Sequence, residues 1–173
     1  MTADGDLDGR PLPAGVRRAT VSDLPAIGAV QDVAGQSLLL DGIRAAILDS
    51  GRLVVVAEAG GAVVGWAKTH HHPGADGIAP AGQYLGGVIV HPAWRRRGLA
   101  VALTTARMVW IGGRSDRAHL VVNARNRASI ALHDRWGFRD VGRAASFHGV
   151  TFTGGVGLLM TAPVPGQPRE GRR

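Results

Sequence analysis

The stretch that decides the fold is Tyr84-Leu85-Gly86-Gly87-Val88-Ile89-Val90-His91-Pro92-Ala93-Trp94-Arg95-Arg96-Arg97-Gly98-Leu99-Ala100. The run that ends at Val90 predicts a strand, because β-branched residues favour extended backbone and Pro92 cannot continue the hydrogen-bond ladder. A helix is expected from Gly98 to about Ile111, where a pair of glycines ends it. The segment is therefore a strand, a short turn and a helix in succession.

The turn between this strand and this helix has the features of an anion site. The first turn of a helix leaves backbone N–H groups unpaired and carries a partial positive charge, and successive turn amides form a concave nest. Gly98 permits a phosphate to approach the backbone closely, and the small Ala100 keeps the next turn clear. Arg95, Arg96 and Arg97 add positive charge at the mouth. The turn is predicted to hold a pyrophosphate.

Outward from this segment, strand and helix patterns follow one another along the chain. Strands are expected at 16–20, 53–57, 62–68, 84–90, 120–122, 141–148 and 157–161. Helices are expected from 22 or 23, with an apolar stripe at 27, 30 and 33, and at 41–49, 98–111 and 126–135. A Gly-Gly turn joins the second and third strands, and a loop that holds three histidines at 70–72 follows them. This order predicts an α/β fold with a mixed sheet and crossover helices.

The arginine-glycine turn resembles the acetyl-CoA signature of the GNAT N-acetyltransferase superfamily, [Gln/Arg]-x-x-Gly-x-[Gly/Ala], which Arg95, Gly98 and Ala100 match. The resemblance implies that acetyl-CoA is the co-substrate. It implies a binding set made of Arg95, Arg96, Arg97, Gly98, Leu99 and Ala100. It also implies that the backbones of Val88, Ile89 and Val90 bind the pantetheine arm, and that one of their amides stabilises the oxyanion of a tetrahedral intermediate.

A second stretch, residues 126–138, is similar to the superfamily's N-x-x-[A/S]-x-x-L-Y-x-x-x-G-F helix. The resemblance implies that Asn126 and Ser129 face the pantetheine or phosphate groups. His133 stands where the superfamily usually has the tyrosine that protonates the departing thiolate. Imidazole can supply a proton near neutral pH, so His133 is a candidate general acid as well as a cofactor-binding residue. The alternative, a histidine that is hydrogen-bonded within the cofactor groove, stays open.

The same resemblance implies the whole architecture. The GNAT acyl-CoA N-acyltransferase fold has a central, mostly antiparallel sheet of about six to seven strands, splayed at the cofactor site and flanked by about four helices. We expect one such domain over residues 15–162. Residues 1–14 and 163–173 are rich in proline, glycine or charge and are expected to be a flexible leader and a flexible tail.

No general base is evident. Members of this superfamily often carry a glutamate on the strand before the cradle or on the strand before the second block, but 85–88 and 120–123 hold no carboxylate. Glu58 lies near the glycine turn and is expected to be exposed. Removing a proton at neutral pH costs ~4–5 kcal/mol for an amine of pKa ~10.4, against ~1 kcal/mol for an α-amine of pKa ~8. We therefore expect a weakly basic acceptor amine, or proton loss through water.

Histidines and aromatic residues outline a candidate acceptor site. The run at 70–72 has no Cys, Asp or Glu beside it at ligand spacing, so no metal is expected, and an ordinary polar loop is the alternative to a substrate-lining role. The segment 147–155 resembles the loop that joins the last two strands of GNAT folds and often borders the acceptor. The candidate lining residues are His72, Tyr84, Phe147, His148 and Phe152.

Composition excludes several other classes of protein. The 173 residues suit one domain, and the absence of cysteine excludes disulfides and thiolate metal sites. No apolar run reaches the ~20 residues of a membrane span and no signal peptide is evident, so we expect a cytoplasmic protein without a membrane partner. The net charge of +7 suits a polyphosphate cofactor, whereas 5% aromatic residues and scattered arginines argue against nucleic acid as a partner.

The combined prediction is an acetyl-CoA-dependent N-acetyltransferase. It would acetylate a small-molecule amine or a peptide N-terminus by direct attack in a ternary complex, because no serine or cysteine nucleophile arrangement is present. The alternative is a non-catalytic acyl-CoA-binding module that has kept the cradle and lost its catalytic groups. The resemblance also allows for a homodimer.

Overall fold

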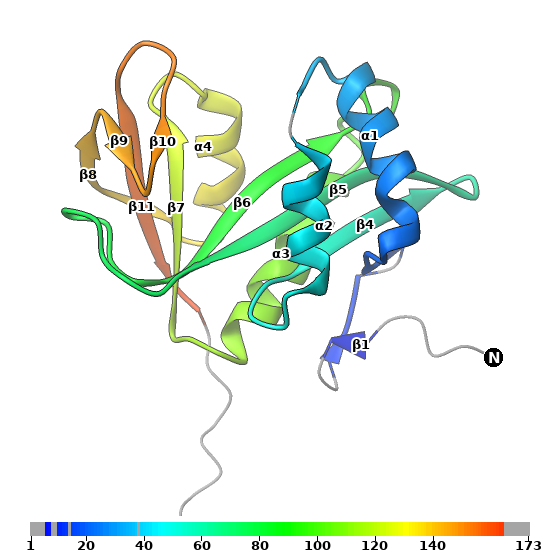
Figure 1. The fold of residues 1–173 in the computed structure, drawn as a ribbon, viewed down its shortest axis with the longest axis horizontal. Helices are drawn as coiled ribbons and strands as arrows, with labels where there is room; N and C mark the ends of the chain where they lie inside the picture. The colour runs from blue at the N-terminus through cyan, green and yellow to red at the C-terminus, as the bar shows by residue number, and fades with distance from the viewer. Residues whose placement is uncertain (1–5, 8–9, 14, 38, 165–173) are drawn as a thin grey trace, which may run out of the picture. The chain divides into compact units, whose positions relative to one another are not determined.

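A computed structural model describes residues 6–7, 10–13, 15–37 and 39–164 of the chain. It divides the chain into two compact units, Met1–His70 with Gly86–Trp110 and His71–Leu85 with Ile111–Arg173. The main sheet is mixed and has seven strands in the order β3-β4-β5-β6-β7-β11-β8, and the described residues also form four α-helices (Figure 1). The strands β5 (Ala62–His72) and β6 (Gly82–Val90) each contribute residues to both units.

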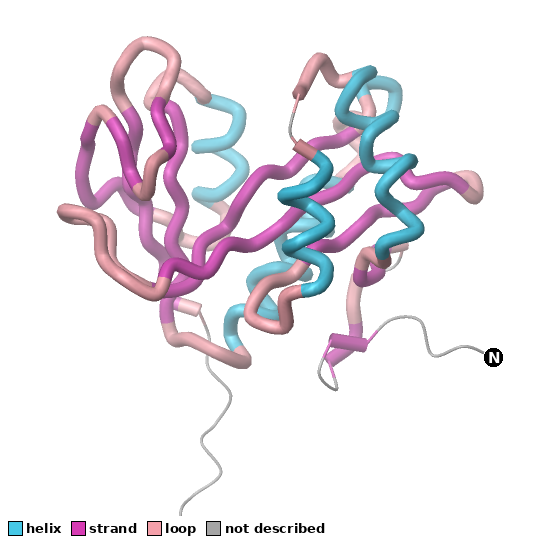
Figure 2. Tube along the Cα trace, in the orientation of Figure 1, coloured by secondary structure: helices cyan, strands magenta, loops and turns pink. Residues whose placement is uncertain are grey.

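The first unit holds two helices on one face of its strands and one on the other. Its elements are β1 (Asp6–Leu7), β2 (Arg10–Pro11), β3 (Val16–Arg18), η1 (Val21–Asp23), α1 (Leu24–Val33), α2 (Leu40–Leu48), β4 (Val54–Ala59), β5, β6, η2 (Pro92–Trp94) and α3 (Leu99–Gly112). Ile27 of α1 and Ile43 of α2 pack against Trp66 in a buried core. On the opposite face, Gly65 leaves room for Leu103 of α3. Figure 2 shows α1 and α2 in front of these strands and α3 behind them.

Glycine sets the turn between β4 and β5. Gly60 and Gly61 adopt positive φ values of 59° and 77°, as a tight hairpin turn requires, and Ala59 pairs with Ala62 across it. The predicted hairpin is therefore confirmed. The predicted loop at 70–72 is wrong, because β5 continues through His72. Strand pairing uses the backbone, so a run of polar side chains does not prevent it.

The second unit is built on three antiparallel strands. Its further elements are β7 (Arg117–Asn123), α4 (Arg127–Asp134), β8 (Arg139–Ala144), β9 (Ser146–Phe147), β10 (Val150–Thr151) and β11 (Gly157–Pro163). β11 pairs antiparallel with both β7 and β8. β6 joins β7 in parallel at Tyr84↔His119 and Leu85↔Leu120. A buried cluster of Tyr84, Phe147 and Leu159 lies on one face of this unit.

The remaining predicted elements are present with shifted ends. The predicted strand 141–148 is divided, because β8 ends at Ala144 and a separate β9–β10 hairpin follows. In the predicted leader, Asp6–Leu7 pairs with Arg10–Pro11, while residues 1–5, 8–9 and 14 lie outside the described residues, as do residues 165–173 of the predicted tail. Among the described helices, none has both the length and the apolar character needed to cross a membrane.

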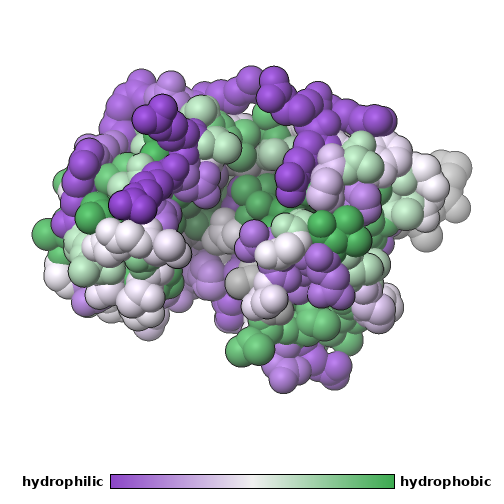
Figure 3. Space-filling view, turned by 90° about the horizontal axis from the view of Figure 1, so that it is seen from above, coloured by the Kyte–Doolittle hydropathy of each residue, from purple (hydrophilic) through white to green (hydrophobic). Residues whose placement is uncertain are grey.

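Apolar side chains also stand on the surface of the first unit. Val33 at the end of α1 is exposed, as are Leu39, Leu40 and Leu48 at the ends of α2. The space-filling view in Figure 3 shows apolar residues in green scattered among hydrophilic ones in purple. Such scattered exposure is normal for a folded domain.

Candidate functional site

The predicted cradle lies between β6 and α3, where the backbone bends twice. Arg96 and Gly98 adopt left-handed backbone angles, with φ of 62° and 79°. In the described chain the ladder of α3 begins with the bond from Ala102 N to the Gly98 carbonyl, so the first-turn amides of residues 98–101 have no partner within the helix. A turn that presents successive unpaired amides at a helix N-terminus is a ready site for a phosphate.

The three arginines of this turn keep their charges unneutralised. Arg95 donates from Nε to the Val90 carbonyl at 3.3 Å, and the guanidinium of Arg97 lies 4.7 Å above the Trp94 ring. In the described part of the chain, no carboxylate forms an ion pair with Arg95, Arg96 or Arg97. The residues present therefore suit the pyrophosphate of acetyl-CoA, which would supply the missing negative charge.

Gly98 faces open space. A Cβ built on it would meet no heavy atom within 4 Å, and its φ of 79° disfavours any larger residue. The space beside Gly98 is therefore available to a ligand rather than to a neighbouring side chain.

The last residues of β6 are fixed against β5. A Cβ on Gly65 would lie 3.1 Å from the Ile89 carbonyl oxygen, so the close approach of the two strands depends on glycine at that position. The backbone N–H of His91 donates to the Val64 carbonyl at 2.8 Å, directly after Val90. The predicted pantetheine-binding backbone, Val88–Val90, therefore leads into the cradle along a well-anchored strand.

In the second unit, the second block forms helix α4 as predicted. The Asn126 side chain caps this helix, because its Oδ1 accepts from Ser129 N at 3.1 Å. Gly137 with φ of 77° ends the segment and Phe138 is buried, which matches the expected Gly-Phe exit. The predicted contacts of Asn126 and Ser129 with the cofactor remain predictions.

His133 is buried in the last turn of α4. Only 1% of the residue is exposed, and its ring packs edge-on against Phe138 at a centroid distance of 5.6 Å. Its Nδ1 lies 2.8 Å from the Ser129 carbonyl oxygen and 3.3 Å from Ser129 Oγ. A bond to a carbonyl requires a proton on Nδ1, so in the neutral ring Nε2 carries the lone pair. The role of general acid stays a prediction, and the ring is hydrogen-bonded within its own helix.

The predicted acceptor-lining residues lie together within the second unit. The rings of His72 and His148 stack at 3.8 Å with an interplanar angle of 2°, and the Tyr84 ring stands edge-on to both. Tyr84 donates its hydroxyl to the Pro80 carbonyl at 2.6 Å, and burial, followed by the nearby Asp76, raises its pKa to about 12. Phe147 and Phe152 belong to the same apolar cluster as Tyr84.

Three further residues were not predicted for the site. His119 lies against Tyr84 with ring centroids 5.0 Å apart, and its pKa is lowered by burial first, then by Arg117 and His148. Lys68 and Arg107 lie in the first unit beside Gly86. Sequence patterns give no sign of such residues: Arg107 and His119 each stand alone between apolar neighbours, and Lys68 belongs to no motif. Among the described residues, no group of three or more His, Cys, Asp or Glu side chains could hold a metal ion.

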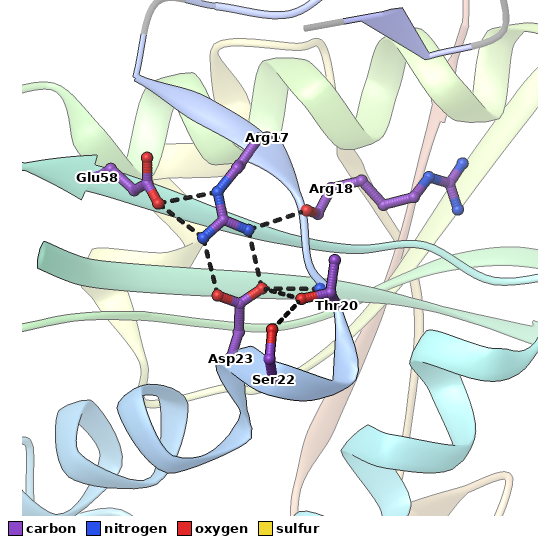
Figure 4. Close-up of polar contacts among 6 residues, drawn as sticks. All are labelled: Arg17, Arg18, Thr20, Ser22, Asp23 and Glu58. Atoms are coloured by element: carbon purple, nitrogen blue, oxygen red, sulfur yellow. Dashed lines mark hydrogen bonds and ion pairs between the residues drawn. The ribbon is translucent and has the colours of Figure 1, made fainter. Parts of the chain in front are cut away.

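Glu58 is exposed as expected, and it is bound to Arg17. Arg17 donates to Glu58 Oε1 at 2.8 Å and, with two nitrogens, to both oxygens of Asp23 at 2.8 Å each (Figure 4). The bond from Arg17, more than the bond from Thr20 N, lowers the pKa of Asp23 to about 2. The lowered pKa makes Asp23 a weak base, and the carboxylate of Glu58 is engaged by Arg17.

Solved structures share this fold. The ribosomal-protein-S18-alanine N-acetyltransferase from Escherichia coli is 19% identical and aligns over 91% of this chain and 98% of its own, with a TM-score of 0.69. Salmonella typhimurium yncA, solved with its cofactor acetyl-CoA, is 22% identical over 91% and 98%, with a TM-score of 0.66. Naa20 from Chaetomium thermophilum, in complex with a bisubstrate analogue, is 18% identical over 86% of each chain, with a TM-score of 0.68.

The sequence itself also carries a family match. No curated protein matches the chain, but the acetyltransferase (GNAT) family model matches residues 29–138, which is more than half of it. That range includes β4 to β7, the arginine turn, α3 and the whole of α4. The chain belongs to the GNAT acetyltransferase family and is an acetyl-CoA-dependent N-acetyltransferase.

Proposed function

We propose that this enzyme transfers the acetyl group of acetyl-CoA directly to an acceptor amine in a ternary complex. The observation that carries the proposal is the turn of residues 95–100, where unpaired amides, three unneutralised arginines and open space at Gly98 coincide. In this arrangement Arg95 to Arg97 would bind the pyrophosphate, and the backbone of Val88–Val90 would bind the pantetheine arm. One of these amides would donate to the thioester oxygen as negative charge develops there.

The chemistry follows from this placement. The amine nitrogen forms a bond to the acetyl carbon as the carbon–sulfur bond breaks, and CoA leaves as a thiolate that takes up a proton. The imidazolium form of His133, which carries a proton on Nε2 as well as on Nδ1, or water, is the proposed source of that proton. Asn126 and Ser129 are proposed to contact the cofactor, and His72, Tyr84 and His148 to line the acceptor site.

The acceptor is proposed to be a peptide N-terminus or a small-molecule amine. The first candidate is favoured by likeness to a protein that is named for the alanine of ribosomal protein S18, although that likeness at 19% identity concerns the fold. A peptide amine also has the lower pKa, and so loses its proton at less cost than an alkyl amine.

Calorimetric titration with acetyl-CoA, and with CoA for comparison, tests the cradle. Wild-type protein is expected to bind at micromolar concentration, and Gly98→Glu to lose at least ~10-fold in affinity, because a carboxylate would occupy the phosphate site. Gly35→Glu is the matched control: Gly35 also has positive φ and open space around it, and it lies outside the cradle. Absence of binding to wild type, or equal losses in both variants, would overturn the proposal.

Turnover is then measured by thiol release from acetyl-CoA with three probe amines: an alanine-starting peptide, glycinamide and spermidine. A rate above the amine-free rate with at least one probe is expected. Tight acetyl-CoA binding with no turnover on any of the three would instead support a binding module.

A further inference from the structure

The lone lysine of the chain lies over the strand that leads into the cradle. Lys68, on β5, is the only lysine among 173 residues. A Cβ built on Gly86 of β6 would lie 2.9 Å from Lys68 Cγ and 2.9 Å from the His70 ring. Both side chains therefore occupy the room that glycine leaves at position 86, only two residues before Val88. Any larger residue at 86 would push them away.

A buried arginine fixes this pair of backbone positions. Arg107 of α3 is 0% exposed, and its Nη1 donates to the carbonyl of Gly86 at 3.0 Å and to the carbonyl of Lys68 at 3.3 Å. Its Nη2 donates to Thr104 Oγ1 at 2.8 Å. One guanidinium thus ties Lys68 and Gly86 to the same point of α3, which is the helix that begins at the cradle.

The surroundings of the Lys68 ammonium disfavour its charged form. Burial lowers the pKa of Lys68, and the positive charge of Arg52 lowers it further. In the described residues no carboxylate lies within ion-pair distance of Lys68. The titratable or cationic groups that face Lys68 or its backbone are Arg52, His70 and Arg107, and none of them favours an additional positive charge.

We propose that Lys68 is the proton acceptor for the incoming amine, an inference that rests on the proposed function. The lysine stands over Gly86 on the strand whose next residues are proposed to hold the thioester. Lys68 would supply the missing general base. Many GNAT enzymes carry a glutamate on one of two strands, and the corresponding residues here, 85–88 and 120–123, hold no carboxylate.

Neutral Lys68 takes one proton from the ammonium form of the acceptor. The freed amine forms the carbon–nitrogen bond as the carbon–sulfur bond breaks. The thiolate takes its proton from His133 or water, and the second proton of the amine replaces it there. Lys68 then releases its own proton to water, so the products are an acetylated amine, CoA and one proton. An ordinary lysine of pKa ~10.4 would be only ~0.1% neutral at pH 7.4, so each pH unit by which the pKa falls increases the competent fraction about tenfold.

Because the chain has a single lysine, its titration can be read directly. Reductive methylation with ¹³C-formaldehyde labels only Lys68 and the amino terminus, and ¹³C NMR then follows each label against pH. The Lys68 signal of the native protein is expected to titrate below the value measured for the same label in urea. Equal values in the two states would overturn the inference whether or not the enzyme turns over.

Kinetics on the unlabelled enzyme supply the second readout. With the probe amine of highest rate, the kcat/KM profile of wild type is expected to rise with pH through the pKa of Lys68. Lys68→Arg keeps the charge but cannot become neutral near pH 7. Its kcat/KM should fall by ~10²–10⁴, and the rising limb that follows the pKa of Lys68 should disappear and leave only the ionisation of the probe amine. The calorimetric Kd for acetyl-CoA should not change. His71→Gln, an exposed position three residues further along β5, is the control and should retain the wild-type rate.

Two results would overturn the assignment of Lys68. One is a Lys68→Arg enzyme that keeps its rate within about threefold and its rising limb. The other is loss of the limb in His70→Gln but not in Lys68→Arg, which would make His70 the base. Failure of wild type to bind acetyl-CoA would instead overturn the proposed function, so the two failures can be told apart.

Discussion

Two arginines of the first unit, Arg17 and Arg107, are held in opposite ways. Arg17 reaches two carboxylates, Asp23 and Glu58, and all three groups share a partly exposed ion cluster. Arg107 is fully buried and donates in the described chain to neutral oxygens, namely the carbonyls of Leu103, Lys68 and Gly86 and the Thr104 hydroxyl. Burial lowers the pKa of Arg107 to about 9.

The difference shows what each charge does for the molecule. A paired cation at a surface adds modest stability, because solvent already screens it. Desolvating a buried cation that has no carboxylate partner costs free energy. Such a cation is retained where its hydrogen bonds fix backbone positions that the fold or the site requires. Arg107 fixes the backbone of β5 at Lys68 and of β6 at Gly86. Arg17 binds Asp23 and so fixes the start of α1.

Replacing Arg107 should give the largest effect of this comparison. Arg107→Ala leaves two strand carbonyls and a buried hydroxyl without their donor and opens a cavity, so the free energy of unfolding is expected to fall on the order of 3 kcal/mol. Urea denaturation measures it. The control is Arg44→Ala on the exposed face of α2, which should change stability by less than ~0.5 kcal/mol. A loss below ~1 kcal/mol for Arg107→Ala would show that its hydrogen bonds are dispensable.

The Asp23 pair should give an intermediate effect that depends on pH. Its folded pKa, about 2, lies below the ordinary value near 3.9, so the stabilisation is complete above pH ~4 and is lost as pH falls through ~2. Asp23→Asn should cost about 1–2 kcal/mol at pH 7, after allowance for solvent screening. Urea unfolding of both proteins from pH 7 to pH 2 should show the difference shrinking between pH ~4 and ~2, and a constant difference would contradict the prediction.

The Glu58 pair should give the smallest effect. The Glu58 side chain is 43% exposed, so Glu58→Gln is expected to cost no more than ~0.5 kcal/mol at low salt, and less at 1 M salt. Thermal unfolding at both salt concentrations measures it. If Glu58→Gln lowered the free energy of unfolding as much as Asp23→Asn does, the two carboxylates would contribute equally to stability, and this prediction would be wrong.

Much of the fold could be predicted from local patterns. The hairpin at Gly60-Gly61, the helix after the arginine turn and the Gly-Phe exit of α4 each depend on residues within a few positions of one another. The predicted loop at 70–72 is wrong, because these residues continue strand β5, whose length depends on pairing with backbone far away in the sequence. The division of 141–148 into β8 and β9 likewise depends on how β11 pairs with β8.

The candidate site divides along the same line. Arg95, Gly98 and Ala100 could be proposed as a phosphate site because such a site is built from residues close together in the sequence. Lys68, His119 and Arg107 could not, because each acquires its character from burial and from partners far away in the sequence. His72, Tyr84 and His148 were each predicted as candidate lining residues, but the sequence did not predict that their rings contact one another.

The sequence by itself determined the arginine-glycine turn between β6 and α3, the succession of the main strands and helices, and the family, since these follow from short-range backbone chemistry and from motif spacing. Only the tertiary structure decided which charges are neutralised and which are not. Glu58 became part of an ion cluster, and Lys68 was placed, half-buried, over Gly86. The physical reason is that the electrostatic state of a side chain depends on its solvent exposure and its neighbours in space, and neither is encoded within a few residues of it.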